Sequence, residues 1–261
     1  MGIFSKMYSA TGDIEPINAT ESDYSFKIEG DGAVITKYKG KSSDVIIPDT
    51  LGGYPVTELF NWSFQNCKAI NKIKIPDSVK NIGIQAFAKC IHIENLTIPD
   101  GVENIGIQAF YECNDIKNIY FGKNVRIIGE YAFIGCVSLT NVVIPKSVIE
   151  IQKYAFMKCS SISSVILTEG TEIIGDFAFS DCKCLKSVQL GENLKKLGQG
   201  AFDNCTELSE ISLPNSITCF GVGVFGGCDK IDLDIVLRYY NTKANENKMI
   251  REKDGYFKVI D

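Results

Sequence analysis

Apolar and polar residues follow one pattern that returns many times along the chain. Within Ile93–Pro99, polar and apolar residues alternate with a period of two from Asn95 to Ile98. This alternation predicts a short β-strand that closes at Pro99, because proline cannot donate to a sheet. Val102, Ile105 and Phe110 then follow at wider spacings, which indicate a tight return that is irregular or helical.

The pattern repeats every 23 residues and is marked by a phenylalanine and by a cysteine three positions later. The phenylalanines are Phe64, Phe87, Phe110, Phe133, Phe156, Phe179, Phe202 and Phe225. The cysteines are Cys67, Cys90, Cys113, Cys136, Cys159, Cys182, Cys205 and Cys228. Isoleucine or leucine follows each cysteine after three more positions, and no insertion or deletion separates these landmarks.

One such unit cannot bury its own apolar side, whereas stacked copies can, so the repeat predicts a parallel solenoid. With strands about 4.8 Å apart, its coils would form a rod or arc about 40 Å long. The inner six members of each landmark column are expected to form structural ladders along the core. They are Phe87, Phe110, Phe133, Phe156, Phe179 and Phe202, with Cys90, Cys113, Cys136, Cys159, Cys182 and Cys205.

Glycine fills one further column, between the strand half and the phenylalanine half of the repeat. Its members are Gly83, Gly106, Gly129, Gly175, Gly198 and Gly221, and Gln152 is the exception. Such a column indicates either a close approach of two backbones or a turn with positive φ.

The motif A-F-x-x-C, together with I-P and I-G, resembles the BspA-like leucine-rich repeats, the 23-residue class related to Treponema pallidum surface antigens. The resemblance covers about residues 24–232, and Val45–Thr57 is similar to the longer first repeat of that class. It implies a leucine-rich-repeat solenoid of the α/β repeat class: a right-handed superhelix of short parallel strands with irregular or helical returns and β-hairpin caps. Gly122, Thr168 and Gly191 depart from the pattern where other repeats have proline.

An open solenoid exposes a sheet edge at each end, so both ends are expected to be capped. Phe26–Ile28 and Ala33–Thr36 flank a Gly-Asp-Gly turn, and Met249–Arg251 and Tyr256–Val259 flank Asp-Gly, which predicts a hairpin at each end. The expected organisation is a flexible leader at 1–23, an N-terminal hairpin cap at 24–44, the solenoid at 45–232 and a C-terminal cap at 233–261.

Composition excludes two kinds of partner. The formal net charge is -5 and no basic face stands out, which argues against nucleic acid. No stretch approaches the roughly 20 apolar residues of a membrane helix, so no membrane insertion is expected. Residues 1–9 lack the apolar core of a secretory signal, so either the protein is not exported or a signal has been removed.

The ten cysteines raise the possibility of disulfides or zinc. Eight of them share one column, where neighbours lie within disulfide range but no pairing is favoured over another. A Cys-x-x-Cys pair is absent from the sequence, and zinc sites usually pair thiols closely or mix them with histidine. We interpret the column as structural free thiols, which favour a reducing compartment or an anaerobic habitat, whereas the family resemblance favours the cell surface or secretion.

No catalytic constellation is evident. His92 is the single histidine, and no nucleophile with an adjacent base is suggested by the spacing. Phosphate-binding loops, HExxH and calcium-loop patterns are missing from the sequence. We therefore expect no enzyme activity and no cofactor.

The positions that vary within the strand motif are predicted to point outward. One such column places Tyr120, Val143 and Ile166 on successive coils, and the neighbouring column carries Asn95, Asn118 and Asn141. An exposed apolar patch of this kind marks an interaction site. The alternative is that β-branched and aromatic residues only favour strands, or that the C-terminal region covers this face.

Tyr131, Tyr154 and Phe177 precede their landmark phenylalanines by two positions, and Tyr111, Ile134 and Met157 directly follow theirs. These sets are interpreted as outer structural ladders, with a partner site as the alternative.

The leading hypothesis is a non-catalytic solenoid that binds a protein or matrix partner, and the family resemblance implies adhesin-like surface recognition. The alternative is an intracellular interaction scaffold or effector module that binds a protein of the same cell. A monomer or weak oligomer is expected.

Overall fold

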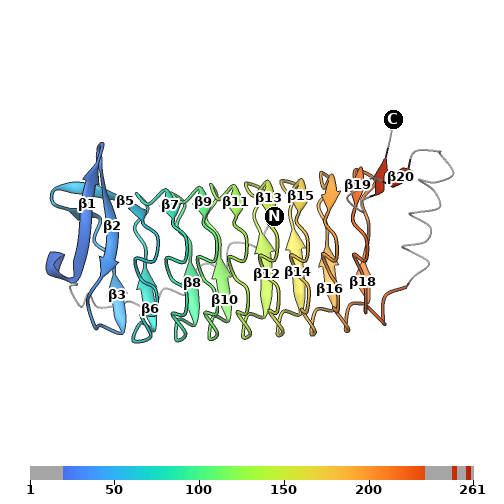
Figure 1. Ribbon diagram of the computed structural model, residues 1–261, viewed down its shortest axis with the longest axis horizontal. Helices are drawn as coiled ribbons and strands as arrows, with labels where there is room; N and C mark the ends of the chain where they lie inside the picture. Colours follow the sequence, from blue (N-terminus) through green and yellow to red (C-terminus); the bar gives the residue numbers. More distant parts are fainter. Residues whose placement is uncertain (1–19, 233–248, 252–256, 260–261) are drawn as a thin grey trace, which may run out of the picture.

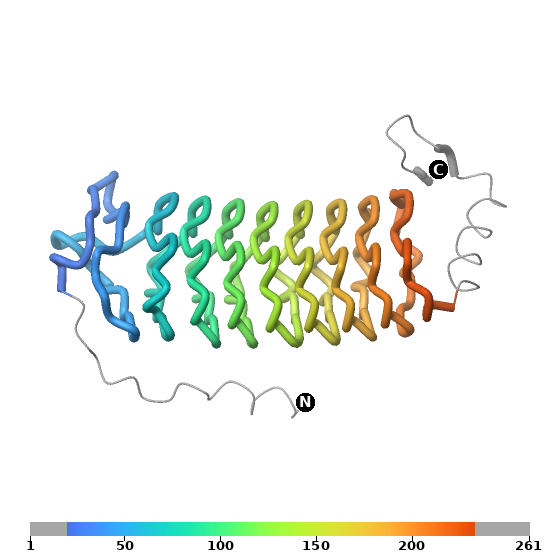
Figure 2. Tube along the Cα trace, turned by 60° about the horizontal axis from the view of Figure 1, so that its bottom comes forward, coloured from blue at the N-terminus to red at the C-terminus, as the bar shows by residue number. Residues whose placement is uncertain are grey.

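The computed structural model describes residues 20–232, 249–251 and 257–259. Each repeat forms one coil, and the coils lie side by side in chain order along a single axis (Figures 1 and 2). Every complete coil gives one short strand to each of two sheets. The chain is therefore a parallel β-solenoid.

The first sheet collects the strands of the alternating motif. Its members are β8 (Asn95–Thr97), β10 (Asn118–Tyr120), β12 (Asn141–Ile144), β14 (Ser164–Leu167), β16 (Ser187–Gln189) and β18 (Glu210–Ile211). They pair in parallel with a register of one repeat, so that Asn118 stands opposite Asn95 on one side and Asn141 on the other. At the N-terminal end β6 (Lys72–Lys74) lies beside β8 (Figure 1) and pairs in parallel with β3 (Asp44–Ile46).

The return of each coil contains a second strand, which the sequence interpretation did not predict. These strands are β7 (Asn81–Ile82), β9 (Asn104–Ile105), β11 (Ile127–Ile128), β13 (Glu150–Ile151), β15 (Ile173–Ile174), β17 (Lys196–Leu197) and β19 (Cys219–Phe220). The return was expected to be irregular or helical, and the repeats contain no α-helix in the described residues, so the helical form and the α/β class are not confirmed. Backbone groups of the return bond to the neighbouring coil at the same register, as Arg126 N–H donates to Glu103 O at 2.8 Å. These backbone groups are therefore already paired and do not need the hydrogen bonds of a helix.

The turn that follows each second strand also bonds to the next coil. Phe110 N–H donates to Ala132 O at 2.8 Å, and Gln108 N–H donates to Glu130 O at 2.9 Å. Glycine opens this turn because the backbones approach closely: a Cβ at Gly129 would lie 2.5 Å from Ile105 O. From Trp62 onward, the positive φ angles occur at other positions, two residues before and two residues after each landmark phenylalanine.

The landmark phenylalanines form one column of stacked rings. From Phe87 to Phe202 each ring is fully buried and lies 5.1 to 5.5 Å from the next, with interplanar angles of at most 10°. Phe64 continues the column at 4.9 Å. Phe225, at the other end, is only partly buried and lies 5.9 Å from Phe202. The core is thus continuous along the stack.

Strands outside the repeat lie at both ends of the second sheet. β1 (Tyr24–Glu29) pairs antiparallel with β2 (Gly32–Tyr38), and β2 pairs in parallel with β5 (Tyr54–Leu59). The five extra residues of the first repeat contribute to a turn at Gly52 and Gly53, both at positive φ, between β4 (Thr50–Leu51) and β5. A short 3-10 helix, Glu21–Asp23, precedes β1.

At the C-terminal end β19 pairs antiparallel with β21 (Phe257–Val259), which pairs with β20 (Met249–Arg251). That these end strands act as caps, and that the domain limits fall as stated above, remain predictions. The expected leader up to residue 19 and the Asp254-Gly255 turn lie outside the described residues.

Candidate binding surface

The outer surface of the first sheet carries the side chains predicted to point outward. Val143 is 51% exposed and Ile166 is 37% exposed, and the two stand opposite each other on β12 and β14. Tyr120 is half-buried, so the exposed apolar part of the predicted patch consists of Val143 and Ile166. We call the outward side of β6 to β18 the strand face.

The asparagine column runs along the strand face beside these apolar residues. Asn118 Nδ2 donates to Asn95 Oδ1 at 2.8 Å, and Asn141 Oδ1 accepts from Ser164 Oγ at 2.7 Å. Asn95, Asn118 and Asn141 are all exposed. These bonds join Asn95 to Asn118 and Asn141 to Ser164, so the column forms a polar border next to Val143 and Ile166.

The strand face carries no charge over its middle. All outward positions from β8 to β16 are uncharged: Asn95, Thr97, Asn118, Tyr120, Asn141, Val143, Ser164, Ile166, Ser187 and Gln189. Charge returns only at the two ends, with Lys72 and Lys74 on β6 and Glu210 on β18. Lys72 is paired with Asp44 at 3.5 Å.

The second sheet has a different outer surface. Two of its outward positions, Glu150 and Lys196, are charged, and the positions just before its strands add Lys80, Glu103, Arg126, Glu172 and Lys195. Lys195 Nζ donates to Glu172 Oε2 across neighbouring coils at 2.9 Å. Ion pairs of this kind characterise a solvated surface, so the two sheets of one solenoid present chemically distinct faces.

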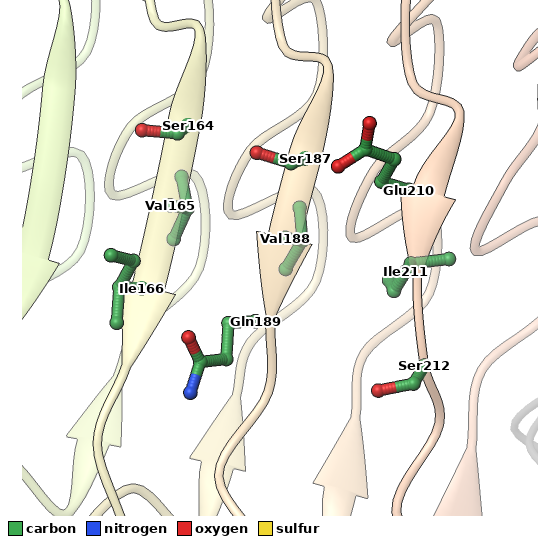
Figure 3. Close-up of a pocket in the computed structure, with 9 residues that line it drawn as sticks. All are labelled: Ser164, Val165, Ile166, Ser187, Val188, Gln189, Glu210, Ile211 and Ser212. Atoms are coloured by element: carbon green, nitrogen blue, oxygen red, sulfur yellow. The ribbon is translucent and has the colours of Figure 1, made fainter.

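A hollow of about 540 Å³ lies at the C-terminal part of the strand face (Figure 3). It spans β14, β16 and the β18 region, and Val165, Val188 and Ile211 lie in its floor. Ser164, Ser187, Gln189, Glu210 and Ser212 supply its polar groups. These residues lie in the columns that were considered from the sequence, but the sequence does not show that the surface is hollowed there.

The cysteine column lies inside the core and holds hydrogen bonds rather than a reactive site. Each buried thiol donates to the carbonyl oxygen of a landmark phenylalanine, as Cys136 Sγ does to Phe110 O at 3.3 Å. Burial raises the pKa of the Cys113, Cys136 and Cys159 thiols well above the usual value. All ten cysteines are free. Within the described residues no group of three or more metal-ligating side chains comes together.

The turns that follow the second strands stack into a row, which we call the turn ridge. It carries the aromatic residues Tyr131, Tyr154 and Phe177. Their rings are nearly parallel, with centroids 4.7 and 5.4 Å apart. All three residues have φ between 54° and 60°, a region that disfavours bulky side chains. The sequence interpretation missed the exposed residues at the N-terminal end of this ridge, Trp62, Ile84 and Ile107, which lie outside the periodic apolar positions.

A solenoid with buried invariant columns and one uncharged outward sheet face defines a repeat protein of the scaffold class. The chain belongs to the family of the BspA type leucine-rich repeat region, whose model matches residues 38–163 and 126–247. The resemblance inferred from the A-F-x-x-C motif is thereby confirmed. The family indicates a repeat scaffold that interacts with proteins.

Solved structures support the same assignment. The leucine-rich repeat protein of T. pallidum is 32% identical, with a TM-score of 0.67, and the match covers 84% of this chain and 93% of that one. A leucine-rich repeat protein from Eubacterium ventriosum ATCC 27560 is 27% identical, with a TM-score of 0.56, and the match covers 78% of this chain and 50% of that one. No curated protein matches the sequence.

The described residues were also considered for membrane spans. None of their helices is long and apolar enough to cross a membrane.

Proposed function

We propose that the chain is a non-catalytic protein-binding scaffold and that the strand face is its binding surface. The observation that carries the proposal is the contrast between the two sheets. Val143 and Ile166 are exposed within an uncharged strip, whereas Glu150 and Lys196 place charges on outward positions of the second sheet. Charged side chains resist desolvation, and an exposed apolar strip between polar borders is typical of an interface.

The rigidity of the strand face supports the same proposal. The backbones of β12 and β14 are paired over four residues each, and Asn118 is bonded through its side chain to Asn95. A partner would therefore find Val143 and Ile166 already in place. A preordered surface loses little conformational entropy on binding, which favours affinity.

The test replaces the apolar side chains without touching the core. The double variant Val143→Ser and Ile166→Ser should weaken binding to a protein partner captured from the native organism or its host, with little change in the thermal unfolding midpoint. Ile149→Ser is the matched control, because Ile149 is also 37% exposed but lies at the second sheet. Equal loss of binding in the control, or no loss in the double variant, would refute the proposal.

Within this proposal, adhesin-like recognition at a cell or matrix surface is the first form of the function, because the family resemblance implies it. The ten free cysteines favour the second form, an interaction scaffold inside the cell, because thiols stay reduced there. Protease treatment of intact cells separates the two forms. Degradation of the protein on intact cells supports surface recognition, and protection until the cells are lysed supports the intracellular scaffold.

A further inference from the structure

The strand face has opposite charges at its two ends, and no ion pair within the described residues neutralises Lys74 or Glu210. Glu210 on β18 forms no ion pair within the described residues, and Lys74 on β6 forms none either. Some exposed acids pair with a lysine one repeat away, as Glu94 with Lys117 at 3.0 Å and Glu207 with Lys230 at 2.6 Å. The residue one repeat before Glu210 is Ser187 and the residue one repeat after Lys74 is Thr97, so neither charge meets an opposite charge there. Lys186, which directly precedes β16, makes no ion pair with Glu210.

We infer that the strand face binds an extended protein segment that crosses the strands, with a basic side chain against Glu210 and an acidic side chain against Lys74. The inference rests on the proposed function and specifies its partner. The uncharged strip between the two ends fits a segment whose central residues are uncharged. The hollow beside Glu210 gives the basic side chain a place to enter, with Ser187, Gln189 and Ser212 as neighbouring polar groups (Figure 3).

The dimensions set the length of the segment. Five strand spacings separate β8 from β18, and β6 lies one repeat before β8. The whole span is therefore about 29 Å at ~4.8 Å for each spacing. An extended chain advances about 3.3 Å per residue, so about nine residues span the two charges. The direction is also fixed, because reversal would place like charges together at both ends.

The charge arrangement excludes some occupants on physical grounds. A strongly charged polymer would leave most of its charges against the uncharged strip between β8 and β16, where nothing compensates their desolvation. A segment with one charge near each end meets its counter-charges and buries its middle on Val143 and Ile166. Complementary end charges of this kind set register and orientation more than affinity.

The test uses a displayed library of random peptides, about twelve residues long so that each can span the face, selected on the purified chain. The selected peptides should carry a basic residue near one end, an acidic residue near the other and an uncharged centre. Their binding should weaken about two- to fivefold with Glu210→Gln and with Lys74→Gln, the effect of an exposed ion pair. Glu192→Gln is the matched control, since Glu192 is an exposed acid in a turn outside the face.

Charge reversal provides the sharper measurement. Selection on Glu210→Lys should yield peptides with an acidic residue at the end that was basic before. Peptides that need Val143 and Ile166 but ignore Glu210 and Lys74 would overturn this inference and leave the proposed function standing. Peptides that are indifferent to all four residues would overturn both. A dimer of the chain that dissociates on Val143→Ser and Ile166→Ser would assign the face to a second copy and also overturn the inference.

Discussion

Truncation of one ring in the phenylalanine column tests whether the stacked core carries the stability of the solenoid. Phe133 is fully buried between Phe110 at 5.1 Å and Phe156 at 5.2 Å, and Phe121 meets it edge-on at 5.9 Å. Removal of a buried phenyl group loses its transfer free energy and leaves a cavity, which together cost about 3–5 kcal/mol. Neighbouring coils fix the backbone on both sides, so little collapse can relieve the cavity.

The position of the ring within the stack should set the magnitude. Phe225 is partly buried and has one stacked neighbour in its column, at 5.9 Å, so Phe225→Ala should cost about half as much. Tyr131→Ala is the surface control: its ring also lies in a stack, at 4.7 Å from Tyr154, but outside the core. We expect the order Phe133, then Phe225, then Tyr131 in loss of unfolding free energy.

Equilibrium unfolding in urea measures these losses. Circular dichroism reports the whole stack, while the single tryptophan, Trp62, reports the first coil by fluorescence. Coincident transitions would show that the coils unfold together and would license one free energy for each variant. A cost for Phe133→Ala below about 1.5 kcal/mol, or a cost equal to that of Phe225→Ala, would refute the cavity reasoning.

Three further outcomes follow from the thiols and from the turns. With a thiol reagent, Cys184 should react in the native protein, Cys67 and Cys219 more slowly, and the other seven cysteines only after unfolding; fast reaction of all ten would contradict the buried column. Since burial raises the pKa of Cys136 above the ordinary 9.0 in the folded state, its contribution to stability is complete below that pH and is lost as the pH rises above it. The urea midpoint of the reduced protein should therefore decrease as the pH is raised from about 8 to about 10, and the midpoint of Cys136→Ser should decrease less. An equal decrease would contradict a contribution from the buried Cys136 thiol. Lys158 has a φ of 62°, so Lys158→Gly should raise the unfolding free energy by about 0.5–1 kcal/mol because glycine adopts this angle without strain. Lys146 does not have a positive φ, so Lys146→Gly should lower the unfolding free energy. The reverse order in urea unfolding would contradict the strain argument.

The sequence predicts the solenoid because its strongest signal is the exact spacing of equivalent residues along the chain. A column such as Phe110, Phe133 and Phe156 returns every 23 residues without interruption, and only stacking of whole units can bury such a column. The first strand was also predictable, because Leu96 and Ile98 face the core while Asn95 and Thr97 face outward. Both inferences need only the side-chain pattern within one repeat and the fact that this pattern recurs along the chain.

The second strand was not predictable in the same way. Only two residues of each coil, such as Ile127 and Ile128, belong to it, and two residues cannot show an alternation. What makes them a strand is the neighbouring coil, which accepts and donates at the same register. A partner that comes from another repeat leaves no local trace in the sequence, so the spacing of Val125 and Ile128 looked compatible with a helical turn.

The positive φ angles also depend on neighbouring coils and could not be located from the sequence. The glycine column suggested a positive-φ turn or a close backbone approach at Gly129, and the residue with positive φ is Tyr131. Gly129 is needed because the backbone at Ile105 lies too close for a Cβ. Tyr131 is held at φ 57° by cross-coil bonds on both sides of it. Tertiary hydrogen bonds thus place a bulky residue where local preference would place glycine.

The candidate binding surface follows from the same division between fixed and variable columns. Stacking requires Leu96, Ile119 and Val142 to face the core in register, but it places no demand on the chemistry of the outward positions beyond their spacing. Each outward position of the strand face can therefore change alone, at little cost to the fold. The charges that frame the strand face, Lys74 and Glu210, are such free choices, because no ion pair in the described residues requires either. An unpaired charge at each end of an otherwise uncharged strip has a consequence only when a partner meets it. Peptide selection on Glu210→Lys is therefore the most direct way to distinguish a binding face from a merely tolerated surface.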